Sequence, residues 1–111
     1  MENRIFYKEN ALPFPQQDAV LSTRFQENGK AIPWKLRALS QKENEEIGKR
    51  QGRNEKQYLT AVLAECVVFP DLKEISLQDS YGVMGQEELL LRMLTTGEFA
   101  ALEAAVEEIN Q

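Results

Sequence analysis

The feature that most constrains the fold is the segment QEELLLRML at 86–94, which is dense in large apolar residues. Successive residues of a helix are about 100° apart, so Leu89 and Leu91 would lie about 200° apart around the helix axis. One buried face cannot hold both, and such a helix needs apolar contacts on two sides. Those contacts come from the rest of this chain, from a second copy of it, or from a different protein.

This segment, with a methionine that precedes it, is the candidate partner or oligomer surface. Its residues are Met84, Leu89, Leu90, Leu91, Met93 and Leu94. Methionine suits an adaptable surface because its side chain is unbranched and polarizable. A Leu and Met stripe at helical spacing belongs more often to a core. For each residue the core of its own chain therefore ranks first, contact with a second copy second, and a groove for another protein third.

The rest of the sequence predicts an α+β fold, with an N-terminal β-hairpin followed by about four helices in a single small domain. The hairpin is indicated by Asn28-Gly29, because a two-residue turn needs positive φ at both positions. The turn sets a register that gathers apolar side chains on one face. The pairs in this register are Phe25 with Ile32, Thr23 with Trp34, and Leu21 with Leu36.

We expect two parts, an extended N-terminal arm at 1–17 and a single α+β domain at 18–111. Pro13 and Pro15 disfavour a helix in the arm. Its apolar side chains, which include Phe6 and Phe14, favour an arm that covers part of the domain. The domain is expected to hold the hairpin at 20–39 and helices at about 41–51, 55–69, 76–81, 86–94 and 97–109.

Three of these helices begin at a capping-box signature, a hydroxyl residue with an acid three positions later. The pairs are Ser40 with Glu43, Ser76 with Asp79, and Thr95 with Glu98. The helix at 55–69 is the most hydrophobic long segment, and Pro70 is expected to stop it. Cys66 lies within its apolar stripe, which predicts a buried and inert thiol rather than a nucleophile.

The composition argues against an enzyme. The chain has no histidine, which removes Ser-His and Cys-His nucleophiles, imidazole bases and the common His-based metal sites. We expect no catalytic residues, no metal ligands and no cofactor. One enzymatic alternative stays open, a carboxylate site made from Asp71, Glu74 or Asp79. It requires two of these acids to converge in a concave pocket.

The net charge of −5 is unevenly distributed along the chain. Residues 1–54 hold 10 Lys and Arg against 7 Asp and Glu, and residues 55–111 hold 3 against 11, which gives +3 and −8. The acidic half argues against nucleic acid as a partner, and favours a solvated surface over a face for a basic partner. No apolar run reaches the ~20 residues of a membrane helix. A single cysteine and an N-terminus without the apolar core of a signal peptide fit a reducing cytoplasm.

Three segments carry a resemblance to a known family: STRFQENGKAIPWKLRALSQKENEEI, VVFPDLKEISLQDSYGVMGQEELLLRML and GEFAALEAAVEEIN. In these segments and in the order of its elements, the chain resembles the XkdN-like tail assembly chaperones of phages and of PBSX-type defective prophages. The resemblance covers roughly residues 20–110 of the chain. It lies in packing and turn patterns rather than in a chemical motif, and it brings no catalytic residue with it.

The resemblance implies a non-enzymatic protein that binds the tape-measure protein, the tail-tube protein or both during tail assembly, and that is absent from the finished particle. Such a chaperone needs exposed apolar surface, balanced by charge that keeps it in solution. The alternative is a structural tail or head-tail component that stays in the particle. A homo-oligomer is possible under either interpretation.

Overall fold

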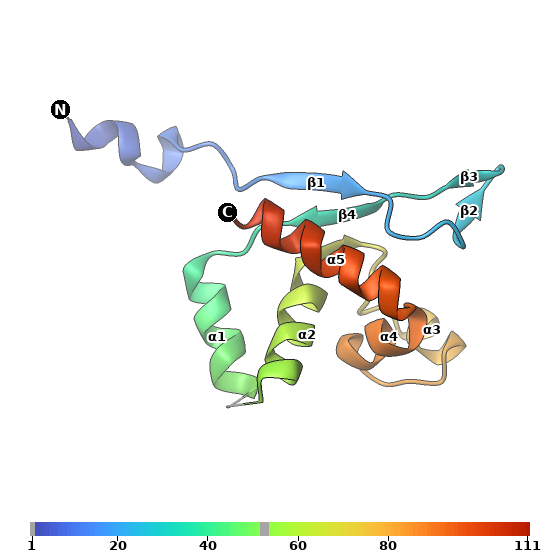
Figure 1. Ribbon diagram of the computed structural model, residues 1–111. Coiled ribbons are helices and arrows are strands. Elements are labelled where there is room, and N and C mark those ends of the chain that lie inside the picture. Colours follow the sequence, from blue (N-terminus) through green and yellow to red (C-terminus); the bar gives the residue numbers. More distant parts are fainter. Residues whose placement is uncertain (1, 52–53) are drawn as a thin grey trace.

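The computed structural model describes residues 2–51 and 54–111, and it has the expected α+β class as a single small domain (Figure 1). The elements are η1 (Asn3–Phe6), η2 (Lys8–Asn10), β1 (Gln16–Ala19), β2 (Gln26–Glu27), β3 (Lys30–Ala31), β4 (Trp34–Arg37), α1 (Gln41–Gln51), α2 (Glu55–Cys66), β5 (Val67–Phe69), α3 (Ile75–Ser80), α4 (Gln86–Met93) and α5 (Thr96–Ile109). Strands β1, β4 and β5 form an antiparallel sheet in the order β1-β4-β5. The helices lie on one side of this sheet (Figure 1).

The predicted turn is confirmed, with φ of 53° at Asn28 and 77° at Gly29. Strands β2 and β3 flank it, and the Ile32 N–H donates to the Phe25 carbonyl at 2.9 Å as the predicted register requires. Beyond this point the register prediction is wrong. Strand β4 pairs instead with β1, so that Trp34 lies opposite Ala19 and Leu36 opposite Gln17.

The hairpin register breaks at Arg24. This residue leaves the hairpin to reach helices α4 and α5, where its guanidinium donates to the Met93 carbonyl at 2.8 Å and to Glu98. Leu21 and Ser22 become buried as the segment turns inward, and the paired strand resumes at Ala19.

The N-terminal arm does not cover the domain, contrary to expectation. It projects from the body of the molecule (Figure 1), and Phe6 is 73% and Leu12 89% exposed. Its hydrogen bonds within η1 and η2 are local, and Pro15 accepts a hydrogen bond from the Ala38 N–H at 3.2 Å where the chain joins the sheet. Strand β1 begins at Gln16, so the sheet takes in the last two residues of the predicted arm.

Four of the five predicted helices agree with the structure to within a residue at each end. The exception is the segment 55–69, where α2 ends at Cys66 and the chain continues as β5 alongside β4. A residue before proline is disfavoured in the helical conformation, and the Val-Val-Phe sequence has high strand propensity. The other neighbour of β4 therefore comes from the end of the predicted helix.

Two of the three predicted capping boxes form. Ser40 and Glu43 exchange hydrogen bonds of 3.0 Å each, and Thr95 and Glu98 exchange bonds of 2.8 and 3.1 Å. The third prediction is wrong, because α3 begins one residue before Ser76 and has Glu74 at its N-cap. There the Ser76 hydroxyl donates to the Glu74 carboxylate instead.

Each glutamate of the two capping boxes also binds an arginine from the N-terminal half. Glu43 pairs with Arg37 at 3.0 Å, and Arg37 also donates to the Glu65 carbonyl at 3.1 Å, which joins β4 to α1 and α2. Glu98 pairs with Arg24 at 2.5 Å. Hydrogen bonds from Arg24, then from Ser22 and the Thr95 backbone, lower the pKa of Glu98 to about 2. The Arg37 hydrogen bond likewise lowers the pKa of Glu43.

The depressed pKa of Glu98 predicts a loss of stability in acid. The folded state keeps this carboxylate ionised down to about pH 2, whereas its ordinary pKa is 4.5. Its contribution to the free energy of unfolding is therefore complete above pH 4.5 and is lost as the pH falls to about 2. We expect the free energy of unfolding, measured with urea at a series of pH values, to fall less steeply across this window in Glu98→Gln than in the original protein. Glu108→Gln, at an exposed position of the same helix, is the control. Equal slopes for the protein and Glu98→Gln would contradict the prediction.

Candidate protein-binding groove

The six residues of the candidate surface do not lie on one surface. Leu89 and Leu90 are 0% exposed and Met93 is 7% exposed, so these three are core residues of this chain and are not available to a partner. Leu94 is half-buried, whereas Leu91 is 54% and Met84 89% exposed.

The chain itself supplies contacts on one side of helix α4, where Leu89, Leu90 and Met93 are buried. It leaves Leu91 on the opposite side 54% exposed, so the predicted two-sided contact does not form within the chain. Helix α4 packs against α2, and its buried residues join a core cluster that includes Leu63, Cys66 and Leu102. For these buried residues this agrees with the interpretation that ranked first, the core of their own chain. Contact of Met84 and Leu91 with a partner stays a prediction.

The acids of the enzymatic alternative are exposed at Asp71, Glu74 and Asp79. Asp71 accepts the backbone N–H of Lys73, and Glu74 accepts the hydroxyl of Ser76, which are local turn and cap contacts. A buried and concave acid pair is therefore not formed by these three. In the parts of the chain that the structure describes, no three His, Cys, Asp or Glu side chains could together hold a metal ion. No helix in the same residues is long and apolar enough to cross a membrane.

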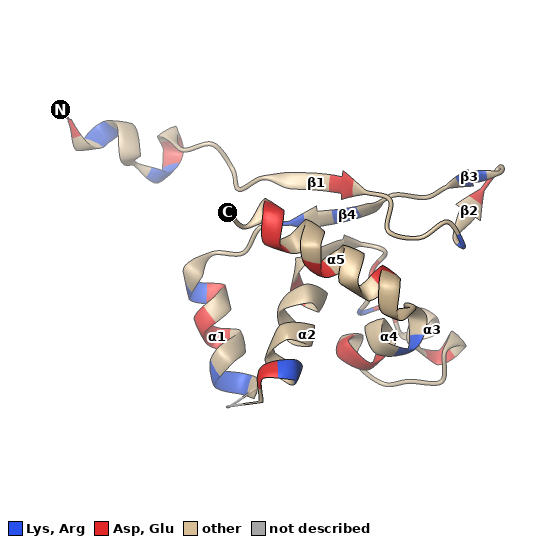
Figure 2. Ribbon diagram, in the orientation of Figure 1, with Lys and Arg blue, Asp and Glu red and all other residues tan. Residues whose placement is uncertain are grey.

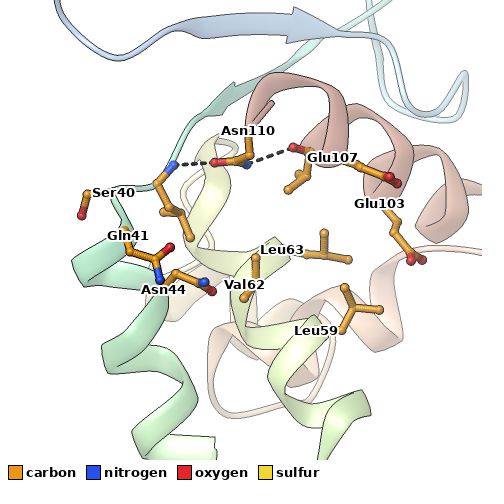
Figure 3. A pocket seen from close by; sticks show the side chains of 11 residues that line it. Ser40, Gln41, Asn44, Leu59, Val62, Leu63, Glu103, Glu107 and Asn110 are labelled. Carbon is orange, nitrogen blue, oxygen red and sulfur yellow. Dashed lines mark hydrogen bonds between the residues drawn. The ribbon is translucent and has the colours of Figure 1, made fainter.

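A groove of about 390 Å³ opens between α1, α2 and α5 (Figure 3). Its floor is apolar and comes mostly from one face of α2, with Leu59, Val62 and Leu63, together with Val106 of α5. Leu39, in the connection between β4 and α1, also lines it. Leu63 and Val106 are buried, whereas Leu59 and Val62 are half-buried and lie open to the groove. These residues belong to the apolar stripes of the two helices.

Asn110 fixes one end of the groove. Its amide oxygen accepts the Leu39 N–H at 2.8 Å, and its amide nitrogen donates to the Val106 carbonyl at 2.9 Å (Figure 3). The same nitrogen lies 3.7 Å from the Cys66 sulfur. Burial raises the pKa of this thiol, as expected for an inert cysteine. Asn110 was not singled out in the sequence, although an asparagine directly after an amphipathic helix is a known C-cap signal.

The rim of the groove is polar and is acidic along one side. Glu103 and Glu107, one turn apart and both exposed, come from α5, and Gln41 and Asn44 come from α1. Asn44 is held in place because its side-chain oxygen accepts the Tyr58 hydroxyl. Figure 2 shows the acidic residues along α5. An apolar floor with an acidic rim fits an apolar segment that carries basic residues at its sides.

A family described as "Phage XkdN-like tail assembly chaperone protein, TAC" matches residues 4–111. The chain belongs to this family. The match confirms the resemblance found in the sequence and extends it from about residue 20 into the N-terminal arm.

This XkdN-like protein is also similar to a solved structure, the crystal structure of the protein yqbn. The TM-score is 0.91 at 21% sequence identity, and the match covers 99% of this chain and 96% of that chain. The likeness supports the fold described above. No curated protein is similar enough to this chain to count as a match.

The contrast between Leu90 and its neighbour gives a direct test of the packing of α4. Leu90→Ala removes a fully buried side chain, and we expect it to lower the free energy of unfolding by about 2–5 kcal/mol. Leu91→Ala makes the same chemical change at a side chain that is 54% exposed, and we expect a change within about 0.5 kcal/mol. Urea unfolding of the two variants measures both values. Similar losses of stability for the two variants would contradict the burial of Leu90 and the exposure of Leu91.

Proposed function

We propose that this XkdN-like protein binds the tape-measure protein, the tail-tube protein or both during tail assembly in the host cytoplasm. It keeps its client, the tail protein that it binds, in solution and releases it as the tail forms. Family membership supports a general role in tail assembly. The groove between α1, α2 and α5 supports the choice of surface, because it combines an apolar floor with a polar rim on the described part of the chain.

The dimensions of the groove suit a few side chains of the client rather than a whole domain. A volume of about 390 Å³ lies in the range of ~300–1,000 Å³ that is usual for ligand pockets. An amphipathic helix that lies across such a groove inserts apolar residues at i, i+3 or i+4. Two or three Leu, Ile or Phe side chains of the client would contact Leu59 and Val62. Lys or Arg beside them would face Glu103 and Glu107.

The proposed activity is binding and needs no chemical step. The acidic rim gives selectivity and speeds encounter, while the apolar floor supplies most of the affinity. This division suits a transient chaperone, since a client held by a few side chains can be taken over by the growing tail. The negative net charge of −5 also favours keeping the complex in solution.

Co-expression with the tape-measure protein of the same genetic element tests the proposal. We expect the tape-measure protein to become soluble and to co-purify with the chaperone. Glu107→Lys reverses a rim charge and should weaken binding by roughly 1 kcal/mol, about fivefold in Kd. Glu108→Lys, the same change at a neighbouring exposed position outside the groove, should leave binding nearly unchanged. Calorimetry with the purified partners measures both values.

Two results would count against the proposal. If the chaperone is folded and soluble but both the tape-measure and the tail-tube protein still precipitate, it loses its main support. If mass spectrometry finds the protein in purified tails in stoichiometric amount, the structural component retained in the particle becomes the better interpretation. An equal effect of the two lysine substitutions would keep the function but move the binding surface away from the groove.

A further inference from the structure

Strand β1 has an open edge whose backbone hydrogen-bonding groups point to solvent. Within residues 2–51 and 54–111, β1 has one strand neighbour, β4. The Ala38 N–H donates to the Pro15 carbonyl, so residue 15 faces β4 in the ladder. Along an antiparallel strand the backbone N–H and C=O groups of successive residues point alternately toward the two neighbouring strand positions. The even-numbered residues of β1 therefore direct these groups away from β4 and toward solvent. We define the β1 edge by the outward groups of Phe14, Gln16, Asp18 and Val20.

The β1 edge lacks the usual protection against pairing with another strand. Sheet edges are commonly protected by proline, lysine, a bulge or a very short strand. The opposite edge of this sheet has three of these features, because β5 is three residues long, its pairing with β4 contains a register shift, and Pro70 follows it. On β1 the two prolines occupy odd positions, Pro13 and Pro15. Their missing N–H groups therefore fall on the β4 side, and every outward donor from residue 14 to residue 20 remains.

The side chains along the β1 edge are self-complementary in one antiparallel register. With a twofold axis through Gln17, Gln16 lies opposite the partner's Asp18, and Phe14 lies opposite the partner's Val20. An amide facing a carboxylate, and an aromatic residue facing a β-branched one, are both favourable cross-strand pairs.

The neighbouring registers are worse matched. An axis through Asp18 sets two Asp18 carboxylates directly opposite each other, which is destabilising. An axis through Gln16 sets Phe14 against the partner's Asp18, which leaves an apolar side chain facing a charge. The sequence of β1 therefore favours a single register.

Pairing would also cover apolar surface that the chain leaves exposed. Phe14 and Val20 are each 59% exposed. The odd-numbered Gln17 and Ala19 pair with the buried Leu36 and Trp34 and so face the helices, and continuing the strand alternation beyond β1 places the even-numbered Phe14 and Val20 on the opposite face. Contact across the twofold axis would bury both side chains in each copy, and removing apolar surface from water favours association. The arm of each copy would then continue across the other.

We propose that two copies of this protein pair through their β1 strands, antiparallel and with Gln17 on the twofold axis, to form one continuous six-stranded sheet. The order of strands is β5-β4-β1 in one copy, followed by β1-β4-β5 in its partner. The pairing uses the β1 edge and none of the groove residues. It is therefore independent of the proposed client, and its tests use the purified protein alone.

A cysteine at position 17 reports the pairing and its register together. Gln17 would lie opposite the same residue of the second copy in a non-hydrogen-bonded pair. The Cα atoms of such a pair are about 4.5 Å apart, within the ~4.4–6.8 Å range of a disulfide. Gln17→Cys should therefore form a disulfide-linked dimer in oxidised glutathione, seen on a non-reducing gel. The native Cys66 is 0% exposed and does not compete. In Gln16→Cys the two thiols are diagonal to each other and too far apart to bridge, so this variant should stay largely monomeric on the gel.

A proline at position 18 tests the backbone pairing itself. The Asp18 N–H points outward and makes no bond to β4, so Asp18→Pro should leave the circular dichroism spectrum unchanged and convert the dimer seen by sedimentation to a monomer. Asp18→Asn keeps the N–H and should remain a dimer. The proposal is overturned if the original protein sediments as a monomer at every concentration and Gln17→Cys does not cross-link. A cross-link in Gln16→Cys but not in Gln17→Cys would overturn the register. If the protein is a monomer, and the outward N–H groups of the β1 edge become protected from hydrogen exchange only when the tape-measure protein is added, the edge binds the client instead of a second copy.

Discussion

The rest of the structure depends on two glutamates that each serve a helix and an arginine at once. Glu43 caps α1 and binds Arg37, and Glu98 caps α5 and binds Arg24. Each carboxylate satisfies backbone N–H groups that a helix start leaves free, and it ties that start to a segment of the N-terminal half. Of the two ion pairs, the one between Arg24 and Glu98 joins the basic half of the chain to its acidic half. Arg24 also draws its segment out of the hairpin, which explains why the long hairpin predicted from the turn does not form.

Local signals in the sequence predicted local structure well. The Asn28-Gly29 turn, the capping boxes at Ser40 and Thr95 and the helix limits depend on residues a few positions apart, and their physics is contained in the pattern. One local pattern, the capping box at Ser76, was also mispredicted, but most of the mispredicted features are non-local. The choice of β1 and β5 as neighbours of β4, and the projection of the arm, depend on competition between distant segments that no local pattern records. The groove and its fixing residue Asn110 have the same origin, because they exist only once α1, α2 and α5 have packed.

The same distinction explains the Leu/Met run at 89–94. Its spacing called for contacts on two sides, but within this chain the helix buries one side and leaves Leu91 exposed. In the structure Leu89, Leu90 and Met93 are buried in the core of their own chain. The candidate surfaces that remain are elsewhere, the groove on the helical layer and the edge of β1. They share no residue, so two copies joined at the sheet would present two grooves, and two linked sites bind a client that reaches both more tightly than one site does.

Helix α5 closes the core, and it is the last element of the fold to be synthesised. Its buried residues Leu102, Val106 and Ile109 pack with the sheet and with α2. The ribosome releases β1, β4 and α2 first, so the apolar face that carries Trp34 and Leu36 meets water until α5 emerges. A nascent chain that stops before Thr96 leaves that apolar face exposed to the chaperones and proteases of the cell. Translation through α5 is thus the step that commits the polypeptide to its folded form, and interrupted products are left to cellular quality control.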